Sequence, residues 1–90
     1  MSLPFKESRV SDNSFIRIFS SDSSEEELYW HMDRKDRVVR VIKSSGWMYQ
    51  KEDSLPVKLS SGDTFLIKKE TWHRVIRGEG VLEVYIEEKE

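Results

Sequence analysis

The sequence has no cysteine, which excludes disulfide bonds, thiolate metal ligands and a cysteine nucleophile. It has only four glycines and two prolines, and no glycine-rich loop of the kind that binds phosphate groups. No run approaches the ~18 apolar residues that a membrane span needs, and residues 1–7 lack the apolar segment of a secretory signal. We therefore expect a cytoplasmic protein with no membrane partner.

Positive charge is not in excess either, since the formal net charge is −2. Proteins that bind nucleic acid usually carry a basic surface, so no nucleic acid is expected as the main partner. One alternative keeps that class open: a small Greek-key barrel that binds single strands by stacking bases on its tryptophans. Such binding would weaken steeply with salt.

The composition that is present indicates one globular domain, which we place at 1–90. Of the 90 residues, 37% are hydrophobic and 36% are charged. Residues 1–13 are mostly polar, so we expect a loosely ordered segment or one that docks at a sheet edge. Because so short a chain buries a limited core, we expect a homodimer that hides one sheet face.

Short β-rich runs, separated by turn residues, fill the rest of the chain. The predicted strands cover residues 14–19, 28–32, 37–43, 47–51, 57–59, 64–68, 71–77 and 81–87. Many short strands at close spacing indicate an all-β sandwich, barrel or jelly roll. The alternation in 28–32 predicts one face with Leu28, Trp30 and Met32, suited to a second sheet layer or a subunit contact.

The three tryptophans allow two interpretations. Large aromatic side chains dominate both protein cores and subunit interfaces, and either place is expected here. The alternative is a set of platforms for stacking sugars. The residues concerned are Trp30, Trp47 and Trp72.

The chain has two histidines, His31 and His73, and Asp33 follows the first by two positions. Side chains two apart on a strand share a face, so Tyr29, His31 and Asp33 are predicted to point the same way. Convergence with His73 would complete a set of two histidines and one carboxylate, a ligand type suited to Fe(II) and similar ions. The competing interpretation is a pair of hydrogen-bonded interior histidines, with Asp33 held in an ion pair by Arg37.

The order of these residues resembles the cupin superfamily, as a small single-domain member with altered motifs. The first cupin motif is a glycine, five residues, His-any-His, three or four residues, a glutamate, six residues and a glycine. Its two histidines align with His31 and Asp33, and its glutamate aligns with Arg37. Its two glycines align with Glu25 and Ser44.

The second cupin motif is a glycine, five residues, Pro-any-Gly, two residues, a histidine, three residues and an asparagine. Its positions fall, in order, on Gly62, Lys68, Glu70, His73 and Arg77. The spacing of both motifs fits over residues 25–77. Only Gly62 and the two histidines keep the residue type of the family.

The resemblance implies an all-β fold, specifically a small jelly-roll or double-stranded β-helix barrel. It also implies a divalent metal ion (Fe, Mn, Zn or Ni) bound by His31, Asp33 and His73. If the chain is an enzyme, the implied activity is that of a metal-dependent dioxygenase, lyase or isomerase. The alternative is a non-catalytic, metal-free module for binding or oligomerisation.

Arg37 stands where the family has a glutamate ligand, and a guanidinium cannot bind a metal. Its planar group fits carboxylates and phosphates, so Arg37 is a candidate to hold a small anionic ligand. Further candidates for substrate contacts are Arg77, Tyr29 and Gln50. The competing interpretation pairs both arginines with neighbouring carboxylates.

Overall fold

The computed structural model describes residues 5–22 and 28–89, which form β-strands and turns but no α-helix. The strands are β1 (Phe5–Ser11), β2 (Ser14–Phe19), β3 (Asp36–Ser44), β4 (Met48–Lys51), β5 (Val57–Lys58), β6 (Thr64–Ile67), β7 (His73–Ile76) and β8 (Leu82–Lys89). Within the described ranges, no helix is long and apolar enough to cross a membrane.

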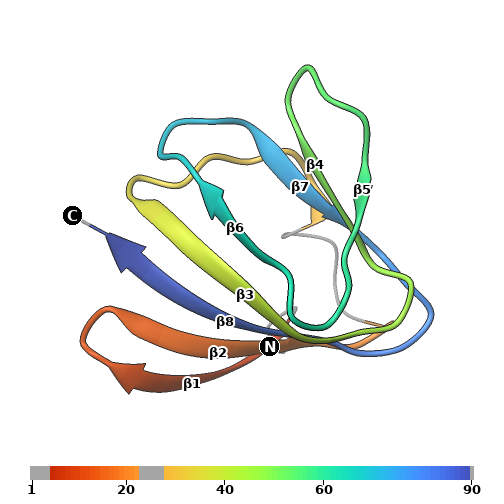
Figure 1. Ribbon diagram of the computed structural model, residues 1–90, viewed down its shortest axis with the longest axis horizontal. Coiled ribbons are helices and arrows are strands. Elements are labelled where there is room, and N and C mark those ends of the chain that lie inside the picture. Colours follow the sequence, from red (N-terminus) through yellow and green to blue (C-terminus); the bar gives the residue numbers. More distant parts are fainter. Residues whose placement is uncertain (1–4, 23–27, 90) are drawn as a thin grey trace.

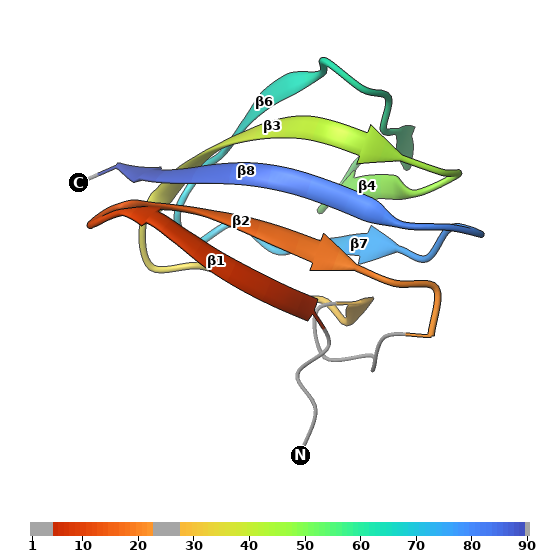
Figure 2. The same ribbon diagram turned by 90° about the horizontal axis from the view of Figure 1, so that it is seen from below.

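The strands form two antiparallel sheets. The large sheet has the order β1-β2-β8-β3-β6 and the small sheet has the order β5-β4-β7 (Figure 1). Seen from below, the strands of the large sheet lie in front of β4 and β7 (Figure 2). The all-β prediction is confirmed, and β5 and β6 are edge strands of their respective sheets.

The core lies between the two sheets and is supplied by alternate residues of the strands. Strand β8 shows the pattern most clearly, because its buried residues alternate with half-buried ones. Each fully buried aliphatic or aromatic side chain contributes about 1.5–3 kcal/mol relative to an exposed one. The buried hydrophobic residues are Phe15, Phe19, Val39, Val41, Trp47, Leu59, Ile67, Leu82, Val84 and Ile86.

One prediction of local structure is wrong, and one of two alternatives is confirmed. Residues 28–32 do not form a strand, because only His31 pairs, in an isolated bridge with His73. Residues 5–11 are not loose: they form β1, which pairs with β2 at the edge of the large sheet, as the edge-docking alternative expected. Backbone hydrogen bonds to β2 give this polar segment its order without a large buried side-chain surface.

The tryptophans occupy two different environments. Trp47 is completely buried, and its indole N–H donates to the carbonyl of Gly80 at 2.8 Å. Trp30 and Trp72 are exposed by 42% and 45%. The core alternative is therefore confirmed for Trp47, and for the exposed Trp30 and Trp72 the subunit-interface alternative stays a prediction. Leu28 packs against the core, whereas Met32 is exposed.

Candidate metal centre

His31 and His73, far apart in the sequence, lie directly opposite each other. The amide of His31 donates to the carbonyl of His73 at 3.0 Å, and the amide of His73 donates back at 2.9 Å. Residues that exchange both backbone hydrogen bonds in an antiparallel pair carry their side chains on the same face. The two imidazole ring centroids are 4.3 Å apart, so the predicted convergence of the histidines is present.

Both imidazoles are oriented by backbone carbonyls. Nδ1 of His31 lies 2.8 Å from the carbonyl oxygen of Tyr29, and Nδ1 of His73 lies 2.9 Å from that of Thr71. A carbonyl oxygen only accepts hydrogen bonds, so the proton is inferred to sit on Nδ1 in each ring. Nε2 is then the remaining ring nitrogen of each histidine, an arrangement found in histidines that bind metal ions.

Asp33 completes the group. Its Oδ2 lies 3.2 Å from Nε2 of His73, and its backbone carbonyl accepts from the amide of Glu70 at 2.8 Å. Oδ2 is buried and has no hydrogen-bond partner among the described residues. With the proton of His73 on Nδ1, two lone pairs face each other at that distance. A cation between them, or a second proton on His73, is the physical way to satisfy both atoms.

The charge state of Asp33 suits a ligand. Burial by itself raises the pKa of this carboxyl group, but the contact with His73 and the charges of Arg37, His73 and His31 outweigh it. The net effect holds the pKa of Asp33 below its ordinary value. The side chain is therefore a carboxylate at neutral pH.

The three side chains have the donor types and proximity of a metal site. One donor atom from each of His31, Asp33 and His73 lies within 4.8 Å of the other two. Two imidazole nitrogens and one carboxylate oxygen suit Fe(II) and related divalent ions. The buried carboxylate oxygen and the carbonyl-oriented imidazoles are therefore compatible with such an ion.

Arg37 contacts this group but is also engaged elsewhere. Its guanidinium lies 3.4 Å from Oδ1 of Asp33, and its Nε and Nη2 donate to Oε2 of Glu88 at 3.2 and 3.0 Å. The cation also lies over the ring of Phe15, 5.7 Å from its centroid. Arg37 thus pairs with carboxylates, as the competing interpretation expected. It also lines the interior beside the two histidines, where a ligand contact would require it to be.

The interior beside the histidines is a cavity of about 50 Å³, enough for roughly one or two water molecules. Arg17 also lines it, and was missed from the sequence. The Nε of Arg17 donates to Glu7 at 2.7 Å, and its guanidinium lies 4.8 Å from the centroid of Phe15. The alternation of Phe15, Arg17 and Phe19 in an apolar strand is the signal that places this arginine on the inner face.

Tyr49 also lines this cavity. Its ring centroid lies 4.8 Å from that of Phe65 and 5.9 Å from that of His73. Burial, with a smaller effect from the charge of Asp33, raises the pKa of Tyr49 to about 12, so its hydroxyl keeps its proton at neutral pH. The buried Trp47 two positions earlier is the signal that would have indicated an inward Tyr49.

The remaining predicted contacts are not brought to this centre. The side chain of Tyr29 is 63% exposed, because residues 28–32 do not follow strand alternation, and only its carbonyl contributes. Gln50 follows the inward Tyr49 on β4 and accepts a hydrogen bond from Arg74 at 2.8 Å on the outer face. Arg77 lies beyond the end of β7 and donates to the carbonyl of Ser21 at 2.8 Å.

No family model matches the sequence, and no curated protein sequence is similar enough to match it. Solved structures share the fold. A cupin domain from Bordetella pertussis Tohama I has a TM-score of 0.64 and 17% identity, over 100% of this chain and 99% of that chain. A cupin-2 domain protein from Shewanella frigidimarina NCIMB 400 has a TM-score of 0.65 and 17% identity, over 94% and 79% of the two chains.

Larger proteins with an established reaction contain a similar fold. The DMSP lyase DddQ from Ruegeria pomeroyi DSS-3 has a TM-score of 0.72 and 11% identity, over 89% of this chain but 40% of the lyase. This chain therefore spans less than half the length of that enzyme. At these identities the likeness concerns the fold, which is the predicted cupin double-stranded β-helix.

Proposed function

We propose that this chain, whose fold is that of the cupins, binds a divalent metal ion through His31, Asp33 and His73 and acts on a small anionic molecule. The observation that carries the proposal is the group of three donor atoms, one from each of these residues, that lie within 4.8 Å of one another. Fe, Mn, Zn and Ni are the candidate ions, because this donor set suits borderline divalent metals.

The ion and the residues around it would each have a separate role. The ion, when bound, would supply Lewis acidity that polarises a ligand oxygen. The contact with His73, and after it the charge of Arg37, keeps Asp33 ionised. Arg37 also adds positive charge to the wall of the cavity, which favours an anionic ligand. Tyr49 keeps its proton at neutral pH and can donate a hydrogen bond to that ligand.

The class of reaction is a further part of the proposal. Dioxygenase, lyase and isomerase activities are all compatible with a metal-dependent cupin. Lyase activity is the first to assay, because a DMSP lyase is among the solved structures with this fold. That likeness is one of fold at 11% identity, so the assay should use several small carboxylates.

Metal uptake is the direct test. Protein purified without chelators and supplied in turn with Fe(II), Mn(II), Zn(II) and Ni(II) should retain about one ion per chain of at least one of them. Asp33→Asn should weaken binding by at least about tenfold, as expected for loss of a charged ligand. Asp12→Asn, which changes an exposed carboxylate away from the centre, is the matched control and should bind normally.

The competing function is a metal-free module for binding or oligomerisation. The ion pair between Arg37 and Asp33 favours it, because it neutralises the carboxylate without any metal. In that case all four metals would give less than about a tenth of an ion per chain, well below the one that a specific site holds. His73→Ala would then lower stability without changing metal content.

A further inference from the structure

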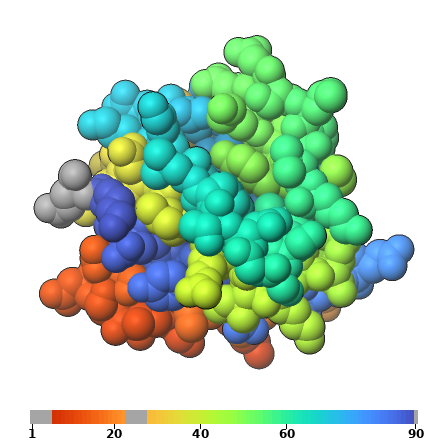
Figure 3. All heavy atoms as spheres, in the orientation of Figure 1, coloured from red at the N-terminus to blue at the C-terminus, as the bar shows by residue number. Residues whose placement is uncertain are grey.

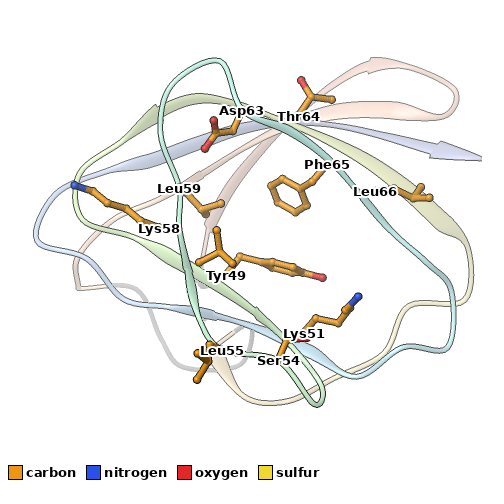
Figure 4. A pocket seen from close by; sticks show the side chains of 11 residues that line it. Tyr49, Lys51, Ser54, Leu55, Lys58, Leu59, Asp63, Thr64, Phe65 and Leu66 are labelled. Atoms are coloured by element: carbon orange, nitrogen blue, oxygen red, sulfur yellow. The ribbon is translucent and has the colours of Figure 1, made fainter.

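A groove opens on the surface between the β4–β5 hairpin and β6. It has a volume of about 520 Å³, within the range of small-molecule sites. In the space-filling view the green turn between β4 and β5 projects beside the teal segment that carries β6 (Figure 3). The close view shows Tyr49 and Phe65 in the middle of the opening, with Leu59 and Lys51 beside them (Figure 4).

The walls of the groove are apolar, although part of them faces water. Leu55 is 85% exposed and Val57 is 60% exposed, and both line the groove. Leu59 and Phe65 continue the apolar wall inward, where they also line the interior cavity. An apolar body laid along this wall would remove these side chains from water, which is favourable in proportion to the area covered.

The groove adjoins the interior cavity beside the candidate metal centre, because the two share lining residues. Tyr49 lines both the groove and the interior cavity, and its ring contacts those of Phe65 and His73. The Tyr49–Phe65 pair therefore stands between the groove and His73. A ligand in the groove would place one end against the Tyr49–Phe65 pair, at the end of the groove nearest the imidazoles.

The charged residues of the groove favour a negative charge on that end of the ligand. Lys51 lines the groove and is the cross-strand partner of His73, so both side chains leave the same face of the small sheet. Lys58 is a second lysine on the groove. The acid present, Asp63, already accepts a hydrogen bond from the amide of Ser60 at 2.8 Å. Neither lysine forms an ion pair with any residue in the described ranges.

We propose that this groove binds an apolar monocarboxylate, with its carboxylate at Lys51 beside His73 and its apolar body along Val57, Leu59 and Phe65. The inference deepens the proposed function by naming the substrate class of that site, and it rests on that function only for the role of the ion. The groove, Lys51 and the apolar wall belong to the chain itself, so binding is expected with or without metal.

A series of straight-chain carboxylates tests the groove. Acetate, butyrate and hexanoate are titrated into the chelator-treated protein, and binding is followed by amide chemical shifts. Affinity should rise by up to about fourfold for each methylene that is buried, until the groove is filled. Hexylamine, which has a similar chain and the opposite charge, should bind more weakly than hexanoate.

Two exposed substitutions separate the apolar and charged contributions. Val57→Ser should weaken hexanoate by at least about threefold and leave acetate unchanged, because one apolar contact is lost. Its matched control is Val10→Ser, which changes an exposed valine on β1. Lys51→Gln should weaken all three carboxylates by about fivefold, the scale of a solvent-exposed ion pair. Lys6→Gln on β1 is the control for lost charge.

Each contrary outcome overturns a defined part of the proposal. Affinity that does not change with chain length, or equal effects of Val57→Ser and Val10→Ser, would exclude the groove as the site. Sedimentation showing that Val57→Ser dissociates a dimer would assign the groove to a second copy of the chain. If the protein binds carboxylates with affinity that rises with chain length but takes up no metal, the proposed function is wrong and the groove proposal stands. If it takes up metal but shows no such rise, the groove proposal is wrong and the proposed function stands.

Discussion

The chemistry of the candidate metal centre depends most on Asp33. It stands where the cupin motif has a histidine, and it is close to one guanidinium and two imidazoles. A carboxylate here brings negative charge that a third histidine would lack, and this charge makes both a metal ion and the Arg37 pair favourable. The same residue therefore supports either function, and its behaviour without metal is informative.

Stability of the metal-free protein should depend on Asp33 in acid. A carboxyl group whose pKa is lowered by folding stabilises the folded state above its unfolded pKa, near 3.8, and this contribution is lost as pH falls through the folded pKa. Asp33→Asn should lower the free energy of unfolding by about 1.5–3 kcal/mol at pH 7, the range for polar interactions of a charged group, because the variant loses the charged contacts with His73 and Arg37. Its loss of stability toward low pH should be smaller than that of the unmodified protein.

Urea unfolding between pH 7 and pH 3 in the presence of chelator measures this difference. Asp12→Asn is the control, since its carboxylate is exposed. Parallel curves for the unmodified protein and Asp33→Asn would mean that Asp33 is not held by cationic neighbours in solution.

At the scale of elements, the turn between β6 and β7 sets the position of His73. Glu70 in this turn has a φ of 60°, a left-handed conformation that side chains with a Cβ disfavour. Its amide donates to Asp33, so the strained residue also links the turn to the segment that carries the first two candidate ligands. Glu70 aligns with a glycine of the second cupin motif, which agrees with the backbone conformation found there.

Replacing Glu70 by glycine should therefore stabilise the protein. Glycine adopts this conformation without steric cost, and we expect the free energy of unfolding to rise by about 0.5–1 kcal/mol. Thermal and urea unfolding measure the change. The neighbouring Lys69→Gly is the control, because the φ of Lys69 is not positive, and it should be neutral or destabilising. A loss of stability in Glu70→Gly comparable to that of Lys69→Gly would contradict this account.

At the scale of the whole molecule, the surface around the His31–His73 bridge carries exposed apolar side chains. Trp30, Met32 and Trp72 are all substantially exposed, and the guanidinium of Arg74 lies 4.9 Å from the ring centroid of Trp30. Exposed aromatic residues beside an arginine are typical of protein interfaces. The homodimer expected from the chain length stays a prediction. We propose this face as its interface.

Trp72→Glu should dissociate such a dimer. A charge at the centre of an apolar interface lacks a partner, and the dissociation constant should rise at least about tenfold. Analytical ultracentrifugation over a range of concentrations measures it, and Val10→Glu, at an exposed position on β1, is the control. A monomer at all concentrations in the unmodified protein would remove the homodimer.

The sequence by itself determined the β-class, most of the strands and the identity of the candidate ligands. Alternation of apolar and polar residues is a local property, so β2, β3 and β8 could be located without knowledge of their partners. The spacing that resembles the cupin motifs, together with the rarity of histidine, similarly singled out His31, Asp33 and His73. For these features the information lies within a few neighbouring residues.

Only the tertiary structure decided which side chains share the interior. His31 meets His73 through one isolated bridge between remote segments, and Arg37 meets Glu88 because β3 pairs with β8 in that register. Tyr49, rather than Gln50, faces the centre because β4 packs with Trp47 inward. These outcomes depend on strand register, and a shift of one residue would turn every side chain of a strand to the opposite face.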